Sequence, residues 1–305
     1  MKTWQADLLI TFGGSLWGLS FIFARWGLQY CSPALFLFLR FFLAALVVWL
    51  IFYKDVNRTP KKIRDRGLIL GLLMGAGYLL QIYSINFTDV ARASFLTGMC
   101  LIFIPFLNFL LFREIVKLHS LIGLILAVIG LYILLDPSFS GLKSGDIMGL
   151  AAMPLWALYM IYMSVFTEKE EGLAKTYQFL FWQLAGVLPV ALITALIFES
   201  GLVKSLHPDL SKAITITPLF LIGLFFNAVL ASVVTVLIQT YSQKHTTAIQ
   251  AMICYQAEPI TATLAAAIIL GDRLTFNVVA GGLVIILAIL ISEAGGLLME
   301  RRKAA

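Results

Sequence analysis

Long apolar runs, separated by short segments that carry most of the charge, follow one another along the whole chain. A helix needs roughly 20 residues to cross about 30 Å of hydrocarbon. Ten charge-poor runs have about this length: residues 7–24, 34–53, 67–87, 93–112, 118–135, 146–166, 176–198, 218–241, 247–270 and 275–298. The sequence lacks the short alternating strands and turn signals that a membrane barrel requires. The pattern therefore predicts an all-α polytopic membrane protein with ten transmembrane helices.

The composition agrees with this prediction. Of the 305 residues, 61% are apolar and 12% are charged, and the mean hydropathy is +0.96. A soluble globule of this size needs more polar surface, so much of the surface is expected to face lipid. The three cysteines and three histidines lie far apart, and the phosphate-binding pattern GxxxxGK[ST] does not occur. We therefore expect no metal, no cofactor and no nucleotide-driven pump.

The distribution of Lys and Arg predicts the orientation in the membrane. With the N-terminus inside, the cytoplasmic segments hold fifteen Lys and Arg residues, and the opposite side holds five. Cytoplasmic loops are normally the basic ones, so both termini are expected in the cytoplasm. The formal net charge of +6 follows from this bias and does not indicate a nucleic-acid partner.

The two halves of the chain resemble each other. A shift of 139 residues aligns five residues with identical ones: Asp7, Leu16, Trp17, Leu19 and Ile22 with Asp146, Leu155, Trp156, Leu158 and Ile161. A shift of 158 residues aligns Gln81, Tyr83 and Ser84 with Gln239, Tyr241 and Ser242. We infer two repeats, residues 1–140 and 141–305, with five spans each. Because five is odd, the second repeat is expected to lie inverted relative to the first, as in carriers that work by alternating access.

Several short motifs occur in a family-specific order: Trp17-Gly18 with Phe21, Arg40, the run Ala93 to Gly98 before Pro105, Glu114, Gly123, Gly145-Asp146, Trp156-Ala157, Glu258-Pro259, Asp272 and Gly281. With these motifs the sequence resembles the drug/metabolite transporter superfamily, specifically its EamA type with ten helices and two repeats. Two positions depart from the family pattern. Asp272 stands where the family usually has Glu, and Pro105 lies four residues after the position that matches Pro259, which leaves the kink of the fourth span unplaced. The resemblance implies a carrier in the inner (cytoplasmic) membrane for small metabolites, amino acids or drugs, often an exporter.

Glu258 is the strongest candidate for the chemistry of the site. It lies near the middle of the ninth expected span, and the nearest charged residues are Lys244 and Asp272. A carboxylate at this depth costs about 2.5 to 3.5 kcal/mol, and desolvation favours its protonated form. It either couples transport to protons or binds a cation, or it is a neutral acid bonded to the Tyr255 carbonyl that Pro259 leaves without its usual donor.

Arg40 and two tryptophans are further candidates with two readings each. Arg40 enters the second span from the outer side, where it either extends to the lipid headgroups or binds a substrate carboxylate or Glu258. Trp17 and Trp156 occupy matching positions in the two repeats. They either form the walls of a central site, where their faces suit a cationic or aromatic substrate, or pack against the glycines of the first span.

Other polar residues lie at a similar depth: Tyr78, Gln81, Tyr159, Asn227, Gln239 and Tyr255. Each either lines a cavity or forms a hydrogen bond between helices. Tyr255 is favoured for the cavity because it is three residues from Glu258 and so shares its helical face.

The sequence thus predicts a secondary-active exporter of small metabolites such as amino acids, related organic compounds or drugs. Its partners are the substrate, membrane lipid, and a proton or counter-substrate that acts through Glu258. The alternatives are a carrier for uptake or exchange of a nucleoside-type or S-adenosylmethionine-like metabolite, a passive channel, and an intramembrane enzyme. A channel needs a filter or re-entrant loop. An enzyme needs a nucleophile with a base, or paired deep carboxylates. The sequence shows neither signal, so we expect no catalytic residues.

Overall fold

Helices form the regular elements of the computed structural model, which describes residues 1–113, 117–135, 143–168, 170, 172–199, 214–271 and 275–304. The α-helices are α1 (Thr3–Leu28), α2 (Pro33–Val56), α3 (Lys61–Phe87), α4 (Val90–Gly98), α5 (Phe103–Phe112), α6 (Leu118–Leu135), α7 (Ser144–Thr167), α8 (Leu173–Thr194), α9 (Pro218–Phe225), α10 (Thr235–Ser242), α11 (Ala248–Cys254), α12 (Ala257–Ala265) and α13 (Phe276–Ala304). Short 3₁₀ segments cover Met99–Ile102 and Gln243–His245, and π-helical segments cover Ala195–Glu199, Phe226–Val234 and Ala266–Leu270. The predicted all-α class is confirmed.

Eight helical stretches within the described ranges are long and apolar enough to cross a membrane. They coincide with eight of the ten expected spans. The other two expected spans, 118–135 and 275–298, fall on α6 and α13, whose apolar stretches Leu118–Ile133 and Val279–Ser292 are shorter. The count of ten spans therefore stays a prediction.

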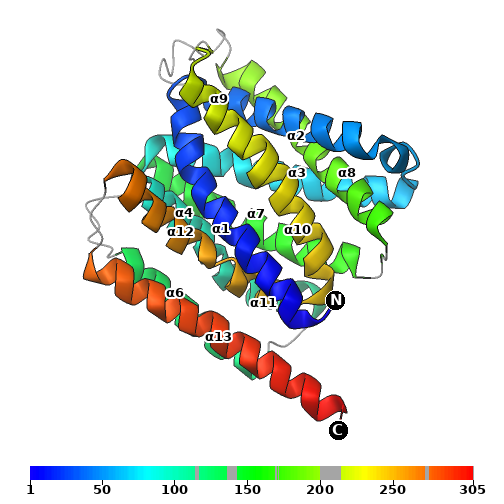
Figure 1. Cartoon of the computed structure of the whole chain (residues 1–305), viewed down its shortest axis with the longest axis vertical. Helices are drawn as coiled ribbons and strands as arrows, with labels where there is room; N and C mark the ends of the chain where they lie inside the picture. The colour runs from blue at the N-terminus through cyan, green and yellow to red at the C-terminus, as the bar shows by residue number, and fades with distance from the viewer. Residues whose placement is uncertain are drawn as a thin grey trace.

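Close helix contacts hold the bundle together (Figure 1). α3 packs against α7 and α8, and α1 packs against α12. α3 and α8 meet at Gly71 and Gly186, where a Cβ atom on Gly71 would lie 2.7 Å from the Gly186 Cα. Such backbone contact is possible only between residues without side chains. α6 and α13 form a pair along one edge of the bundle.

Two of the expected spans are interrupted in the middle. α4 is followed by the 3₁₀ segment Met99–Ile102 and then α5, and α11 is separated from α12 by a turn at Tyr255 and Gln256. Pro105 is the third residue of α5, and Pro259 is the third residue of α12. Proline has no N–H, and the first turn of a helix has no internal acceptor for one. Each proline therefore marks the start of a new half-helix, and the four-residue offset of Pro105 moves the break by the same amount.

Candidate functional site

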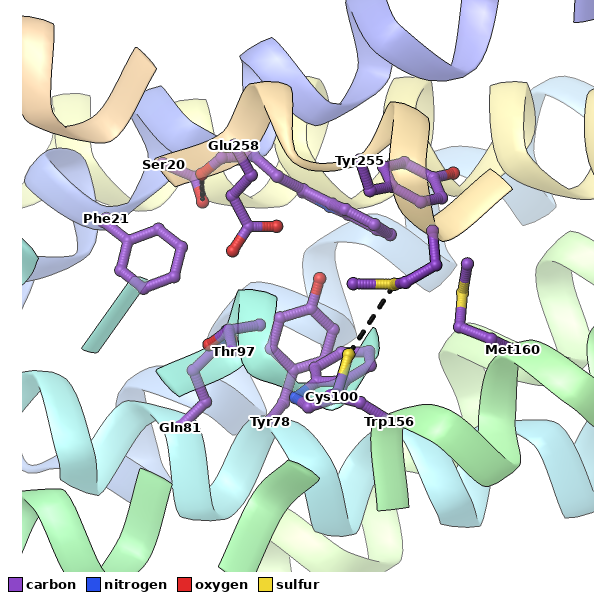
Figure 2. A pocket seen from close by; sticks show the side chains of 12 residues that line it. Ser20, Phe21, Tyr78, Gln81, Thr97, Cys100, Trp156, Met160, Tyr255 and Glu258 are labelled. Atoms are coloured by element: carbon purple, nitrogen blue, oxygen red, sulfur yellow. Dashed lines mark hydrogen bonds between the residues drawn. The ribbon is translucent and has the colours of Figure 1, made fainter. Parts of the chain in front are cut away.

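A cavity lies among the interrupted helices near the middle of the bundle (Figure 2). It is lined by Trp17, Ser20, Phe21, Tyr78, Gln81, Thr97, Cys100, Trp156, Met160, Met252, Tyr255 and Glu258. These residues come from α1, α3, α4, the 3₁₀ segment after α4, α7, α11, the turn that follows α11, and α12. The space open to the centre of a water molecule is about 30 Å³, enough for two or so waters. The space for a bound molecule is therefore small in this conformation.

The break between α11 and α12 places Glu258 in the cavity. α12 begins one residue earlier, and Figure 2 shows the carboxylate pointing from this helix end into the cavity. α1 fixes the position closely, because a Cβ atom on Gly18 would overlap the backbone oxygen of Glu258. Thr261 on the next turn of α12 donates a hydrogen bond to the Ser15 carbonyl of α1 at 3.2 Å. A glycine on α1 is thus required for this approach.

The Glu258 side chain is buried, and one of its two oxygens has no partner among the described residues. It is 6% exposed, and its Oε1 accepts no hydrogen bond from any described residue. The carbonyl of Tyr255, which Pro259 leaves without its usual donor, accepts instead from the Glu258 backbone N–H at 2.8 Å. No ion pair of Glu258 occurs among the described residues. Burying an unpaired carboxylate costs free energy, so a proton or a ligand that neutralises Glu258 is favoured here.

Aromatic rings form a large part of the cavity wall. The ring centroid of Trp17 is 6.4 Å from that of Trp156 and 4.8 Å from that of Tyr255. Tyr78 meets Trp156 edge to face at 4.7 Å. The Trp17 indole donates a hydrogen bond to the Ala231 carbonyl at 2.8 Å, whereas Trp156 packs its indole against Gly77. The structure thus brings both tryptophans to one cavity, and the glycine shown against Trp156, Gly77, belongs to α3 rather than to α1.

Arg40 is buried inside the bundle. Its side chain is 3% exposed, and its Nε donates to the Ser232 hydroxyl at 2.8 Å. The guanidinium carbon lies 4.6 Å from the centre of the Tyr78 ring. Arg40 is not one of the lining residues, although the Tyr78 ring that it contacts is, and its Nη2 has no hydrogen-bond partner among the described residues. The guanidinium is therefore held next to the site and is not presented to it.

The remaining expected site residues divide into two groups. Gln81 lines the cavity and donates to the Thr97 hydroxyl at 2.8 Å. Tyr159 and Gln239 lie outside the lining in a fully buried network, in which the Tyr159 hydroxyl is 2.9 Å from both the Gln183 and the Gln239 oxygen. Asn227 is also buried outside the lining and donates to the Gly223 carbonyl at 2.9 Å.

Sequence reasoning did not select Cys100, Met160 and Met252, although all three line the cavity. The Cys100 thiol donates to the Met252 sulfur at 3.6 Å. Their apolar or weakly polar side chains give no signal in an apolar span. The repeat alignment did give a signal for two of them, because the same shifts place Met160 opposite Phe21 and Cys100 opposite Glu258. Glu114 and Asp272, two motif residues, lie outside the described residues.

Comparisons with known proteins identify the family. The EamA-like transporter family matches residues 4–136 and 143–293. The chain belongs to the EamA-like transporter family. The family consists of transporters rather than enzymes, so this chain is a multi-pass membrane transporter that acts on small molecules.

Relatives of this EamA chain cover nearly its full length. An uncharacterized transporter of Archaeoglobus fulgidus is 25% identical and aligns over 95% of this chain and 86% of its own. A Salmonella typhimurium protein named "Probable amino-acid metabolite efflux pump" is 25% identical over 92% of both chains. A solved crystal structure has the same fold, with a TM-score of 0.71, 15% identity and complete coverage of both chains.

Proposed function

We propose that this EamA transporter is a secondary-active carrier that exports small metabolites, such as amino acids or related organic compounds, by alternating access between two inverted halves. The halves are residues 1–140 and 141–305. In this proposal both termini lie in the cytoplasm, ten helices cross the inner membrane, and Glu258 couples substrate movement to protons or to a counter-substrate. Export is supported by the name of the Salmonella typhimurium relative.

The composition of the cavity carries the proposal. Eight of its twelve lining residues form four pairs under the two shifts of the repeat alignment: Trp17 with Trp156, Phe21 with Met160, Thr97 with Tyr255, and Cys100 with Glu258. Residues that are equivalent in the two repeats meet around one space only if that space lies near the axis relating the repeats. When the two halves exchange their conformations, a cavity in this position opens first to one side and then to the other.

The interrupted helices support the same symmetry. α4 with α5 and α11 with α12 occupy corresponding places in the two repeats, and both carry cavity residues beside their breaks. A broken helix concentrates bending at a few residues and gives a gate that moves without unfolding. The N-terminus and the end of α13 lie towards the same end of the bundle (Figure 1), as an even number of spans requires.

Glu258 is suited to coupling because the other lining residues include no second carboxyl group and no cation. The other ionisable groups among the lining residues are Tyr78, Tyr255 and Cys100, and Arg40 packs against the Tyr78 ring. A carboxyl group without an ionic partner is able to exchange its proton for a cationic substrate as the cavity opens to either side.

The test is proton-linked transport in proteoliposomes. With a pH gradient imposed, a panel of amino acids and amines is added, and dissipation of the gradient is followed with a pH-sensitive dye. We expect at least one compound to dissipate the gradient with wild-type protein, and Glu258→Gln to abolish this while substrate exchange persists. Glu199→Gln is the matched control, because Glu199 lies outside the cavity with hydrogen bonds to both carboxylate oxygens. Full proton-linked transport by Glu258→Gln would refute the coupling role.

A further inference from the structure

Two sulfur atoms meet at the wall of the cavity. The Cys100 thiol donates to the Met252 thioether, and the two sulfurs are 3.6 Å apart. Both side chains line the cavity, and both are buried. Cys100 lies in the 3₁₀ segment after α4, and Met252 lies in α11. A third sulfur-containing side chain, Met160 of α7, lines the same space. Thiol and thioether groups from three helical segments are thus gathered at one small cavity.

A buried carboxyl group lines the same cavity. Figure 2 shows Glu258 pointing into the space that Cys100 also lines. Its Oε1 has no hydrogen-bond partner among the described residues, which also form no ion pair with it. Cys100 and Glu258 are equivalent positions under the shift of 158 residues. The cavity therefore combines soft sulfur donors with a carboxyl group that lacks an ionic partner in the described structure.

From this combination we propose that the cavity binds one soft monovalent metal ion, Cu(I) or its analogue Ag(I), through the sulfurs of Cys100 and Met252. Thiolate and thioether ligands select soft ions of this kind. The bond between the ion and the Cys100 sulfur replaces the S–H bond, and the thiol proton passes to the Glu258 carboxylate in the same cavity. The charge of the ion is then balanced inside the bundle, and the step needs no oxidant or reductant. The flexible Met252 side chain is able to turn its sulfur towards the ion.

The available ligands favour a soft monovalent ion over zinc. The described residues contain no group of three or more His, Cys, Asp or Glu side chains that could hold a metal ion. Zinc sites in proteins use three or four ligands of these types, so Zn²⁺ has no complete site in this part of the chain. The sequence-based expectation of no metal counted cysteines and histidines only. The Met252 thioether, which that count left out, completes a pair of ligands that suits Cu(I) and Ag(I).

A bound ion would join the two expected repeats across the cavity, because Cys100 belongs to residues 1–140 and Met252 to residues 141–305. The site leaves other cavity groups free for a transported substrate. Among these are the Trp156 indole N–H and the Tyr255 hydroxyl, which are buried and have no partner among the described residues. Metal binding is therefore an additional property of the cavity, and it does not depend on which substrate the carrier moves.

Competition for Cu(I) tests the proposal. Purified full-length protein in detergent is added, without oxygen, to the coloured complex of Cu(I) with bicinchoninate, and the loss of colour measures transfer to the protein. We expect the wild type to withdraw one equivalent of Cu(I), and to withdraw no Zn²⁺ from a chelator of matched affinity. Cys100→Ala and Met252→Leu should each weaken Cu(I) binding about tenfold or more. Cys31→Ala is the matched control, a buried cysteine outside the cavity lining, and should leave the affinity unchanged.

Met252→Leu is the decisive variant, because leucine keeps the apolar volume of methionine and removes the sulfur. Unchanged Cu(I) affinity in this variant would overturn the proposal, since a thiol alone would then explain the binding. An equal loss in Cys31→Ala, or equally tight binding of Zn²⁺, would overturn it too.

X-ray absorption of Ag(I) bound to the wild type counts the sulfur neighbours of the ion without any variant. Two or more sulfurs support the site, and a single sulfur contradicts it. None of these measurements involves transport. Failure of metal binding therefore leaves the carrier proposal in place, and a protein that binds the ion but transports nothing would retain the metal site alone.

Discussion

Two buried tyrosines near the cavity have opposite hydrogen-bond environments. The Tyr159 hydroxyl lies between two glutamine oxygens, and Gln183 continues the network to the Thr240 hydroxyl at 3.1 Å. The Tyr255 hydroxyl finds no partner in the described structure, although the residue is 2% exposed. A hydroxyl in a network stabilises the fold, whereas a buried hydroxyl without a partner costs free energy. The first tyrosine is therefore expected to be structural and the second to be kept for another reason.

Replacement by phenylalanine separates these two roles. Tyr159→Phe should lower the stability by about 1 to 3 kcal/mol, because it leaves buried amide groups without their partner. Tyr255→Phe should leave the stability unchanged or raise it. The midpoint of thermal unfolding in detergent measures both. A larger loss for Tyr255→Phe than for Tyr159→Phe would show that the hydrogen-bond assignment is wrong. Ligand affinity should survive Tyr159→Phe, since this residue lies outside the cavity lining.

Glycines determine how closely pairs of helices approach. Gly71 on α3 and Gly186 on α8 bring the two backbones into contact, and a Cβ atom on Gly186 would lie 2.8 Å from the Gly71 Cα. Both partners are backbone atoms, which cannot turn aside as a side chain does. Gly282 inside α13 differs, because an added Cβ atom there would have no described heavy atom within 4 Å. The same substitution therefore has opposite consequences in the two places.

We predict that Gly71→Ala destabilises the protein by about 1 to 3 kcal/mol, because it forces α3 and α8 apart. Gly282→Ala is the matched control and should stabilise by about 0.5 to 1 kcal/mol, since alanine loses less backbone entropy than glycine in a helix interior. Thermal unfolding in the same detergent measures both variants. An equally stable Gly71→Ala protein would mean that the helices are not in backbone contact.

Polar contacts join the two halves near both ends of the bundle. At one end, Asp146 of α7 accepts a hydrogen bond from Thr88 at 2.8 Å and pairs with Arg92 at 3.1 Å. At the other end, Glu170 pairs with Lys62 of the first half at 3.3 Å, and with Lys175 of its own half at 2.9 Å. The hydrogen bond from Lys175, with a second from Lys62, lowers the pKa of the Glu170 carboxyl. A carrier that opens to alternate sides has to break such contacts one end at a time.

The arrangement of the whole chain predicts that both termini lie on the cytoplasmic face. Reporter domains fused in separate proteins to residue 1 and to the C-terminal end should both be active in the cytoplasm, whereas an insertion at Lys143 should report the opposite face. The physical reason is the excess of Lys and Arg in the loops assigned to the inside. Termini on opposite faces would require an odd number of spans, and the inverted pairing of two five-helix halves would then be impossible.

The sequence indicates how deep a residue lies in its span, but not in which direction its side chain points within the bundle. Hydropathy placed Glu258, Trp17 and Trp156 in the middle of their spans, and the structure brings them to one cavity. Tyr159 and Gln239 lie at a similar depth but turn into a separate network. The difference is a rotation about the helix axis. A membrane helix is apolar towards lipid and towards its neighbours alike, so the periodicity of its sequence does not reveal which face is inside.

The sequence by itself determined the all-α class, the positions of the apolar runs, the family and the solitary carboxylate of the ninth expected span, because each depends on local composition or on order along the chain. Only the tertiary structure decided that Arg40 packs against Tyr78, and that Trp17 and Gln81 donate their hydrogen bonds to other residues of the protein. These facts depend on contacts between helices far apart in sequence. The surroundings of Glu258 in the cavity arise from those contacts.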